Sequence, residues 1–408
     1  MHSDGAHPLS GLIADQNGNF YGTTIYGGSS ACNNGIDGGG CGVVYKLAPP
    51  ATPGGAWTET VLHYFTGGAD GAFPYYGAKL IFDANGNIYG TAAQGGALQP
   101  ECDGGFGCGV VFELSPGGTE TVLYTFCSQP GCSDGRQPGS GLIFDNNGNL
   151  YGTTPYGGQF DQGEVFKLSP PAITGGAWTE TVLYNFTGGA DGAFPFAPLI
   201  LDSNGNLYGT ASADGAAGNG VVFKVAPNGT ETVLYTFTGA PDGSTPCAGL
   251  IFDANGNLYS NTEWGGISNL GTVFQLAPPA TPGGAWTETV LYSFAGPDGA
   301  RPYFGTHLLF DANGNIYGQT DEGGATTGTC AGSYCEGYGA VFKLAPPATP
   351  GGAPTETVLF SFPFGGGQPK QVDLFADGNG NLYGTTDEDT TLDNGMVYEL
   401  AGTGFVPP

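Results

Sequence analysis

The sequence predicts an all-β protein, a seven-bladed β-propeller of four-stranded antiparallel blades with a three-stranded last blade. Three observations predict this fold. One pattern recurs seven times along the chain, and each copy contains short strand-like runs separated by glycine-rich turns. Glycine contributes 78 of 408 residues, while aromatic residues remain at 12%. This combination is typical of many short strands joined by tight turns rather than of disorder.

The repeat is marked by Asp-x-Asn-Gly-Asn, an aliphatic or Phe residue, and Tyr. Its seven copies begin at Asp15, Asp83, Asp145, Asp202, Asp253, Asp311 and Asp377. A spacing of this size without helical periodicity favours propeller blades, and an open solenoid of the same units is the alternative. We therefore predict one domain over residues 1–408, with repeats at approximately 4–69, 70–133, 134–190, 191–241, 242–297, 298–367 and 368–408.

The third repeat illustrates the four strands. Strand A is 141–145 (GLIFD), and the Asn-Gly that follows it favours a type I′ hairpin turn, in which both central residues have positive φ. Strand B is 150–154 (LYGTT), and strand C is 163–168 (GEVFKL). Strand D is 179–186 (TETVLYNF), whose alternation suits a half-buried outer strand. The segment 191–195 (DGAFP) leads into the next strand A.

The seventh repeat is incomplete. The TETVL segment appears six times, and the last repeat ends with 395–400 (GMVYEL) and a short tail, 401–408. A strand C without a strand D presents unpaired backbone groups, which natural proteins usually cover. We expect either a missing downstream segment or strand pairing with another chain at this blade-seven edge.

The recurring YGTT-x-x-GG, G-x-VFKL and TETVLYxF segments resemble the Gloeo/Verruco (GloVer) tandem repeat of bacterial extracellular proteins. The resemblance covers nearly the whole chain. It implies an extracellular repeat protein with a propeller fold, of a kind that often ends in a surface anchor. It implies no established catalytic residues. Blade seven departs from the pattern by lacking strand D, and blade four departs by reading ASADG after strand B.

The charge balance limits the partners. The chain carries 8 Lys and Arg against 36 Asp and Glu, a net charge of −28. Such a surface repels phosphate backbones, which excludes nucleic acid, and anionic membranes are disfavoured for the same reason. No apolar run is long enough for membrane insertion. The first residues show no signal-peptide pattern, as expected for a mature chain.

Eight of the nine cysteines fall into four close pairs, Cys32/Cys41, Cys102/Cys108, Cys127/Cys132 and Cys330/Cys335. Local disulfides formed in an oxidising compartment are the favoured interpretation, with metal binding as the alternative; no His lies near any pair. The prediction is therefore a secreted or cell-surface protein with no metal site at these pairs and with Cys247 as a free thiol.

The candidate functional residues lie on the face formed by the B–C and D–A loops, which we call the top face. The two residues after the YGTT-like segment are Glu263-Trp264, Asp321-Glu322 and Asp387-Glu388 on the neighbouring blades five, six and seven. If the chain is an enzyme, Glu263, Asp321 and Asp387 are the predicted catalytic carboxylates, because glycoside hydrolysis needs paired acids. Such acids could equally hold Ca²⁺, or be ordinary surface acids of a strongly acidic protein.

Aromatic side chains occupy the same loops. Tyr26, Tyr156 and Trp264 are predicted ligand-binding residues, together with Glu322 and Glu388, because aromatic planes beside carboxylates suit sugar rings. Packing between blades is the alternative, and it is favoured for the aromatic residues of the DGAFP-like segments. The Asp-x-Asn-Gly-Asn turns resemble the start of a Ca²⁺ loop but lack its terminal bidentate Glu. No cofactor is expected, with Ca²⁺ at these turns or acids as the alternative.

Two classes of function remain. The first is a secreted or surface-attached, non-catalytic module that binds extracellular glycans or proteins or builds surface structure. The second is a secreted carbohydrate-active enzyme, a glycoside hydrolase or lyase. We favour the first class because the repeats are nearly uniform and no catalytic signature such as a nucleophile elbow or a P-loop is present.

Overall fold

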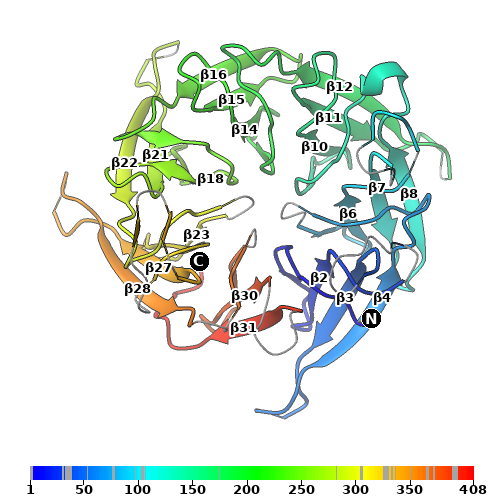
Figure 1. The fold of residues 1–408 in the computed structure, drawn as a ribbon, viewed down its shortest axis with the longest axis horizontal. Helices are drawn as coiled ribbons and strands as arrows, with labels where there is room; N and C mark the ends of the chain where they lie inside the picture. The colour runs from blue at the N-terminus through cyan, green and yellow to red at the C-terminus, as the bar shows by residue number, and fades with distance from the viewer. Residues whose placement is uncertain are drawn as a thin grey trace.

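A computed structural model describes most of the chain. The described residues are 3–29, 32, 39–52, 54–75, 79–96, 98–102, 105, 107–173, 175–281, 283–303, 307–324, 330–331, 334–335, 337–349, 351–363, 367–370, 373–387 and 394–408. Seven small antiparallel sheets stand in a ring around a central axis (Figure 1). Six sheets have four strands and the last has three, so the predicted seven-bladed propeller is confirmed.

The strand order in every blade runs from the axis to the rim in chain order (Figure 1). The first strands, nearest the axis, are β1 (Ile13–Ala14), β5 (Ile81–Phe82), β9 (Ile143–Phe144), β13 (Ile200–Leu201), β18 (Ile251–Phe252), β23 (Leu309–Phe310) and β29 (Phe375–Ala376). The second strands are β2 (Phe20–Thr24), β6 (Ile88–Ala92), β10 (Leu150–Thr154), β14 (Leu207–Ala211), β19 (Leu258–Thr262), β24 (Ile316–Thr320) and β30 (Leu382–Thr386).

The third strands are β3 (Val43–Ala48), β7 (Val110–Leu114), β11 (Glu164–Ser169), β15 (Val221–Val225), β21 (Thr272–Ala277), β27 (Ala340–Ala345) and β31 (Met396–Leu400). The fourth strands at the rim are β4 (Thr58–Tyr64), β8 (Glu120–Thr125), β12 (Thr179–Asn185), β16 (Glu231–Thr236), β22 (Thr287–Ser293) and β28 (Thr355–Ser361). Two short pairs, β17 (Gly243–Ser244) with β20 (Trp264–Gly265) and β25 (Cys330–Ala331) with β26 (Tyr334–Cys335), lie in loops, as does the 3₁₀ turn η2 (Pro130–Cys132).

The turn between the first and second strands differs from the sequence prediction. In blade one the Gly18 N–H donates to the Asp15 carbonyl, and Gly18 has φ +76°, but Asn17 does not have positive φ. A type I′ turn is therefore wrong, and the pattern is that of a type I turn followed by a left-handed glycine. The carboxylate of Asp15 explains the difference, because it accepts hydrogen bonds from the amides of Asn17 and Asn19 and fixes the loop.

The hydrophobic core lies in the seams between successive blades. One cluster, for example, joins Tyr89 and Leu123 of blade two to Leu142 and Phe166 of blade three. Blades one and seven close the ring in the same way, since Phe20 packs against Tyr383 at a ring-centroid distance of 4.6 Å. A hydrogen bond from the His7 amide to the Asn394 carbonyl, 2.8 Å long, ties the two ends of the ring together.

Three of the predicted disulfides are present, Cys32–Cys41, Cys102–Cys108 and Cys127–Cys132. For the fourth pair, β25 and β26 place Cys330 opposite Cys335 in register, but their side chains lie outside the described residues. Cys247 is free and buried. Within the described part of the chain, no helix is long and apolar enough to cross a membrane.

Candidate functional site: a charged arc on the top face

A repeated backbone frame positions the top-face side chains. In six blades, the residue after the second strand donates its N–H to the carbonyl of the residue that precedes the proline of the DGAFP-like segment, as in Asp321 to Arg301 (3.1 Å) and Glu263 to Thr245 (3.1 Å). Blade three has Pro155 at this position, which has no N–H. The pre-proline residue in turn bonds to the preceding blade, as in Arg301 to the Leu270 carbonyl (2.8 Å). Six of these pre-proline residues have positive φ: His7, Phe73, Gln137, Phe194, Thr245 and Arg301. The frame therefore fixes two sets of top-face side chains relative to each other, those that follow the second strands and those that precede the prolines.

Arg301 joins the predicted residues of blades five and six. Its guanidinium lies 2.6 Å from Oε1 of Glu263 and 2.7 Å from Oε1 of Glu322. The same guanidinium stacks over the ring of Trp264 at 4.2 Å from the ring centroid. Burial raises the pKa of Glu263 even though Arg301 acts in the opposite direction. Glu263, Trp264 and Glu322 are thus brought together, with their charge balanced by an arginine that the sequence analysis did not single out.

Asp321 and Asp387 continue this cluster onto blade seven. Burial raises the pKa of Asp321 well above its usual range, and Oδ1 of Asp321 is buried without a hydrogen-bond partner. Asp387 lies 3.1 Å from Nζ of Lys370 and 2.8 Å from Nδ1 of His7. Burial alone would raise the pKa of Asp387, but the hydrogen bond from His7 and the charge of Lys370 together lower it. The two aspartates interact electrostatically yet favour opposite protonation states.

The predicted aromatic residues fall into two groups. Tyr26 lies beside His7, with ring centroids 5.3 Å apart, and so extends the cluster to blade one. Tyr156 lies elsewhere, in blade three, under Arg136 at 5.2 Å from the ring centroid. We name the first group the charged arc; it comprises Tyr26, His7, Asp387, Lys370, Asp321, Glu322, Arg301, Glu263 and Trp264. Glu388 lies outside the described residues.

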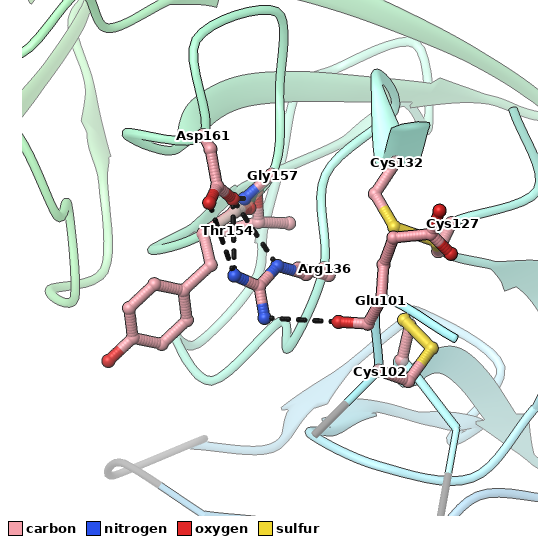
Figure 2. A network of polar contacts seen from close by, with 10 residues as sticks. Glu101, Cys102, Cys127, Cys132, Arg136, Thr154, Gly157 and Asp161 are labelled. Carbon is pink, nitrogen blue, oxygen red and sulfur yellow. Dashed lines mark hydrogen bonds and ion pairs between the residues drawn. A yellow bond between two sulfur atoms is a disulfide. The ribbon is translucent and has the colours of Figure 1, made fainter. Parts of the chain in front are cut away.

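Figure 2 shows the surroundings of Arg136, apart from the arc. Arg136 lies 3.1 Å from Oδ1 of Asp161 and donates to the Glu101 carbonyl at 3.4 Å, beside the disulfides of blade two. The sulfurs of Cys102–Cys108 and Cys127–Cys132 pack together in one buried cluster. This second polar group braces the loops of blades two and three against each other.

A third group crosses the axis and was also missed from the sequence. Asp373 of blade seven lies 2.7 Å from Nδ1 of His307 in blade six and 3.5 Å from Nζ of Lys79 in blade two. Burial would raise the pKa of Asp373, but the charges of His307 and Lys79 lower it. The equivalent positions in the other blades are Gly11, Gly141, Pro198 and Gly249. Comparing this position between repeats would have identified the three charged residues.

The Asp of the Asp-x-Asn-Gly-Asn turn is fully engaged by its own loop. Asp15 accepts hydrogen bonds from the Asn17 amide, from the amide and side chain of Asn19, and from the Tyr21 hydroxyl. The same donors surround the equivalent Asp in the other blades, as at Asp253. These bonds stabilise the turn, and this structural role accounts for the recurrence of the motif.

The comparisons with known proteins agree with the repeat pattern. A family model described as the Gloeobacter/Verrucomicrobia repeat matches residues 1–201 and 100–331. No curated protein sequence matches this chain.

Several solved structures show a distant likeness to this chain. A candidate gluconolactonase is 17% identical, with a TM-score of 0.35, covering 61% of this chain and 69% of that one. A candidate 6-phosphogluconolactonase from Bacteroides uniformis is 15% identical, with a TM-score of 0.48 and coverage of 86% and 85%. A protein of unknown function from Dyadobacter fermentans is 12% identical, with a TM-score of 0.44 and coverage of 98% and 94%. Likeness at this level carries no argument about activity.

Proposed function

Because the chain belongs to the Gloeobacter/Verrucomicrobia repeat family, which is defined by its repeat, we propose its function from the site alone. We propose that the chain is an extracellular, non-catalytic module that binds glycans through the charged arc. The observation that carries the proposal is the arc itself. It places two partly buried aromatic side chains, Trp264 and Tyr26, at either end of a row of hydrogen-bonding carboxylates. Aromatic planes pack against the apolar faces of sugar rings, and flanking carboxylates accept bonds from their hydroxyls.

One feature favours binding over catalysis, and two others suit an extracellular binding surface. The carboxylates of Glu263 and Glu322 are both paired with the Arg301 guanidinium, so they are engaged in ion pairs rather than presented to a substrate. The disulfide bonds of the top-face loops favour the extracellular location, since such bonds persist in oxidising compartments. The rigid frame and the stapled loops suit a preformed recognition surface.

A polysaccharide binding screen tests the proposal. The wild-type chain should retain at least one soluble glycan in affinity electrophoresis, and both Trp264→Ala and Tyr26→Ala should weaken that retention by about tenfold or more, as expected for loss of an aromatic stacking platform. Phe160→Ala is the matched control, because Phe160 is 47% exposed and lies in blade three, outside the arc. Equal loss in all three variants, or no retention of any glycan by the wild type, would reject glycan binding.

One observation favours a glycoside hydrolase as a second candidate. Asp321 has a raised pKa and Asp387 a lowered one on adjacent blades, which is the relationship of a general acid to a base or nucleophile. In this candidate, Asp321 would protonate the leaving oxygen and Asp387 would act from the other side of the sugar. Measuring reducing ends released from the retained glycans decides the matter. Release that Asp321→Asn and Asp387→Asn abolish would favour the enzyme, whereas binding without release would favour the module.

A further inference from the structure

The outer edge of blade seven is vacant in the described structure. The strand β31 pairs with β30 alone, whereas the third strand of every other blade also pairs with a fourth strand. Met396 is 38% exposed, but the equivalent Val43 and Val110 are fully buried. The tail after β31 leaves this edge, since Phe405 packs on Tyr317 of blade six at 5.1 Å. An uncovered strand edge of this kind is a template for another strand.

The six blades that have a fourth strand show which contacts blade seven lacks. In each, the phenylalanine that ends the fourth strand packs edge-on against the third-strand aromatic residue of the next blade, at centroid distances of 5.0 to 5.3 Å. The pairs are Phe65–Phe112, Phe126–Phe166, Phe186–Phe223, Phe237–Phe274, Phe294–Phe342 and Phe362–Tyr398. The seventh third-strand aromatic residue is Tyr45 of blade one, and within the described residues blade seven has no fourth strand whose phenylalanine could pack on it.

A cavity of about 400 Å³ lies where that strand would stand. Its lining includes Tyr45, Trp57 and Asp4 of blade one and residues 394–399 of blade seven. Trp57 is 36% exposed. Its equivalent Trp178 packs with Leu123 of the preceding fourth strand. The cavity therefore combines the unpaired edge of β31 with an apolar pocket formed by Tyr45 and Trp57, which we call the aromatic socket.

Asp4 adds a hydrogen-bond acceptor to this cavity. In four other seams, the equivalent aspartate accepts a hydrogen bond from the fourth-strand tyrosine of the preceding blade, as in Tyr184 to Asp191 (2.9 Å) and Tyr235 to Asp242 (3.0 Å). Asp4 is exposed, and within the described residues blade seven has no fourth strand to offer such a tyrosine. The vacant position thus has an unfilled acceptor as well as an unfilled aromatic socket.

We propose that this edge binds a β-strand from another protein, an extended segment with the fourth-strand pattern of alternating Thr or Glu with Val or Leu, ending in Tyr-x-Phe. Backbone bonds to β31 would supply affinity, while the phenylalanine and tyrosine would give register and specificity. A second copy of this chain is a poor donor, because its six strands of this type are each paired along their length within their own blades. Releasing one of them would open a blade.

A peptide titration tests the proposal. The probe is an acetylated and amidated peptide with the sequence of residues 179–186 (TETVLYNF). Binding should saturate at one peptide per chain, slow hydrogen exchange of the amides in β31, and shift the Trp57 emission to shorter wavelength; Trp57→Phe should lose the emission shift alone. A peptide with its last residue changed to Ala should bind at least tenfold more weakly, because it cannot fill the socket.

A double-mutant cycle tests the register. Changing the peptide tyrosine to Phe and changing Asp4→Ala in the protein should each weaken binding by about three- to tenfold, and the two changes together should cost no more than either alone. Additive effects, an absence of saturable binding, or indifference to the terminal phenylalanine would overturn the proposal. So would a dimer by light scattering in which β31 is already protected without peptide, since the occupant would then be a second copy.

Discussion

Glu164 occupies an unfavourable position for a carboxyl group. It begins β11, and the equivalent residues are uncharged in every other blade: Val43, Val110, Val221, Thr272, Ala340 and Met396. Its side chain is fully buried, and neither carboxyl oxygen has a hydrogen-bond partner. Burial raises its pKa well above the usual range, and the charges of Glu180 and Asp134 act in the same direction. The folded protein therefore favours the protonated form of Glu164 and is penalised when the carboxyl ionises.

Replacing Glu164 by Val should stabilise the protein by about 1–3 kcal/mol at neutral pH, because it removes an unpaired buried polar group and introduces the side chain of blades one, two and four. The folded-state pKa is raised, so the wild type loses stability as the pH increases. The gain from the substitution should therefore be larger at pH 8 than at pH 4 in urea unfolding. The reverse exchange in blade four, Val221→Glu, should destabilise. A Glu164→Val variant less stable than the wild type at pH 8 would contradict this account.

Arg301 has the opposite role, since it satisfies two buried acids at once. Removing it by Arg301→Ala would leave Glu263 and Glu322 uncompensated, and we expect a loss of about 2–3 kcal/mol in unfolding free energy. The triple variant that also carries Glu263→Gln and Glu322→Gln should recover much of this loss, because no buried charge then remains. Failure of the triple variant to recover stability would show that Arg301 acts through packing on Trp264 instead.

Several residues of the site could not be found from the acidic pattern alone. The positions of Glu263, Asp321 and Asp387 were predictable because they depart from the repeat at one shared position. Arg301 and Lys370 were missed because they lie in a different loop, and only folding brings that loop beside the second strand. The signal existed nonetheless: Arg301 stands at the pre-proline position where blades two and four have Phe.

At the scale of elements, the strands followed the sequence more closely than the turns. The second strand Leu150–Thr154 has the predicted bounds, whereas the first strand is only Ile143–Phe144. The predicted end of that strand, Asp145, belongs to the turn instead, where its carboxylate accepts backbone amides. Sequence alternation encodes which residues pair, but it does not encode where a side chain takes over the hydrogen bonds of the backbone.

The disulfides of blade two support loops rather than strands. Cys102–Cys108 and Cys127–Cys132 close loops of six and five residues in sequence separation, so each should contribute only about 2 kcal/mol through chain entropy. Under mild reduction, we expect faster hydrogen exchange in 127–136 while β6, β7 and β8 stay protected. Mass spectrometry of exchanged fragments measures this directly. Simultaneous loss of protection in the strands would show that the disulfides hold the blade itself.

At the scale of the whole molecule, six seams repeat one electrostatic conflict. The glutamate of each fourth strand is partly buried and near the aspartate of the preceding DGAFP-like segment, as with Glu180 and Asp134. Burial first, and then the neighbouring aspartate, raise the pKa to about 7 for five of these glutamates, Glu59, Glu180, Glu231, Glu288 and Glu356. Burial raises the pKa of Glu120 to about 6, where the charge of His63 lowers it and that of Asp70 raises it. The ring therefore carries the same pH-sensitive element around its circumference.

These shifts predict that the propeller is most stable in mild acid. A glutamate whose pKa is raised from 4.5 to about 7 on folding contributes stability that is complete below pH 4.5 and is lost as the pH rises through 7. Aspartates such as Asp15, whose pKa is lowered on folding, act oppositely and lose their contribution as the pH falls below about 3.8. Since the net charge of −28 adds repulsion at high pH, the melting temperature should peak near pH 4–5 and decline by several degrees by pH 8.

Calorimetry at constant ionic strength between pH 3 and pH 9 measures this profile, and substitution identifies its source. Changing the six seam glutamates to Gln should flatten the decline between pH 5 and pH 8, because the amides keep the shape of the protonated acid and cannot ionise. Glu101→Gln is the control, since Glu101 is exposed and lies outside the seams, and it should leave the slope unchanged. If the variant with all six substitutions kept the full decline in melting temperature, net charge repulsion and Glu164 would have to account for it instead. The seam glutamates would then not contribute to the pH dependence of stability.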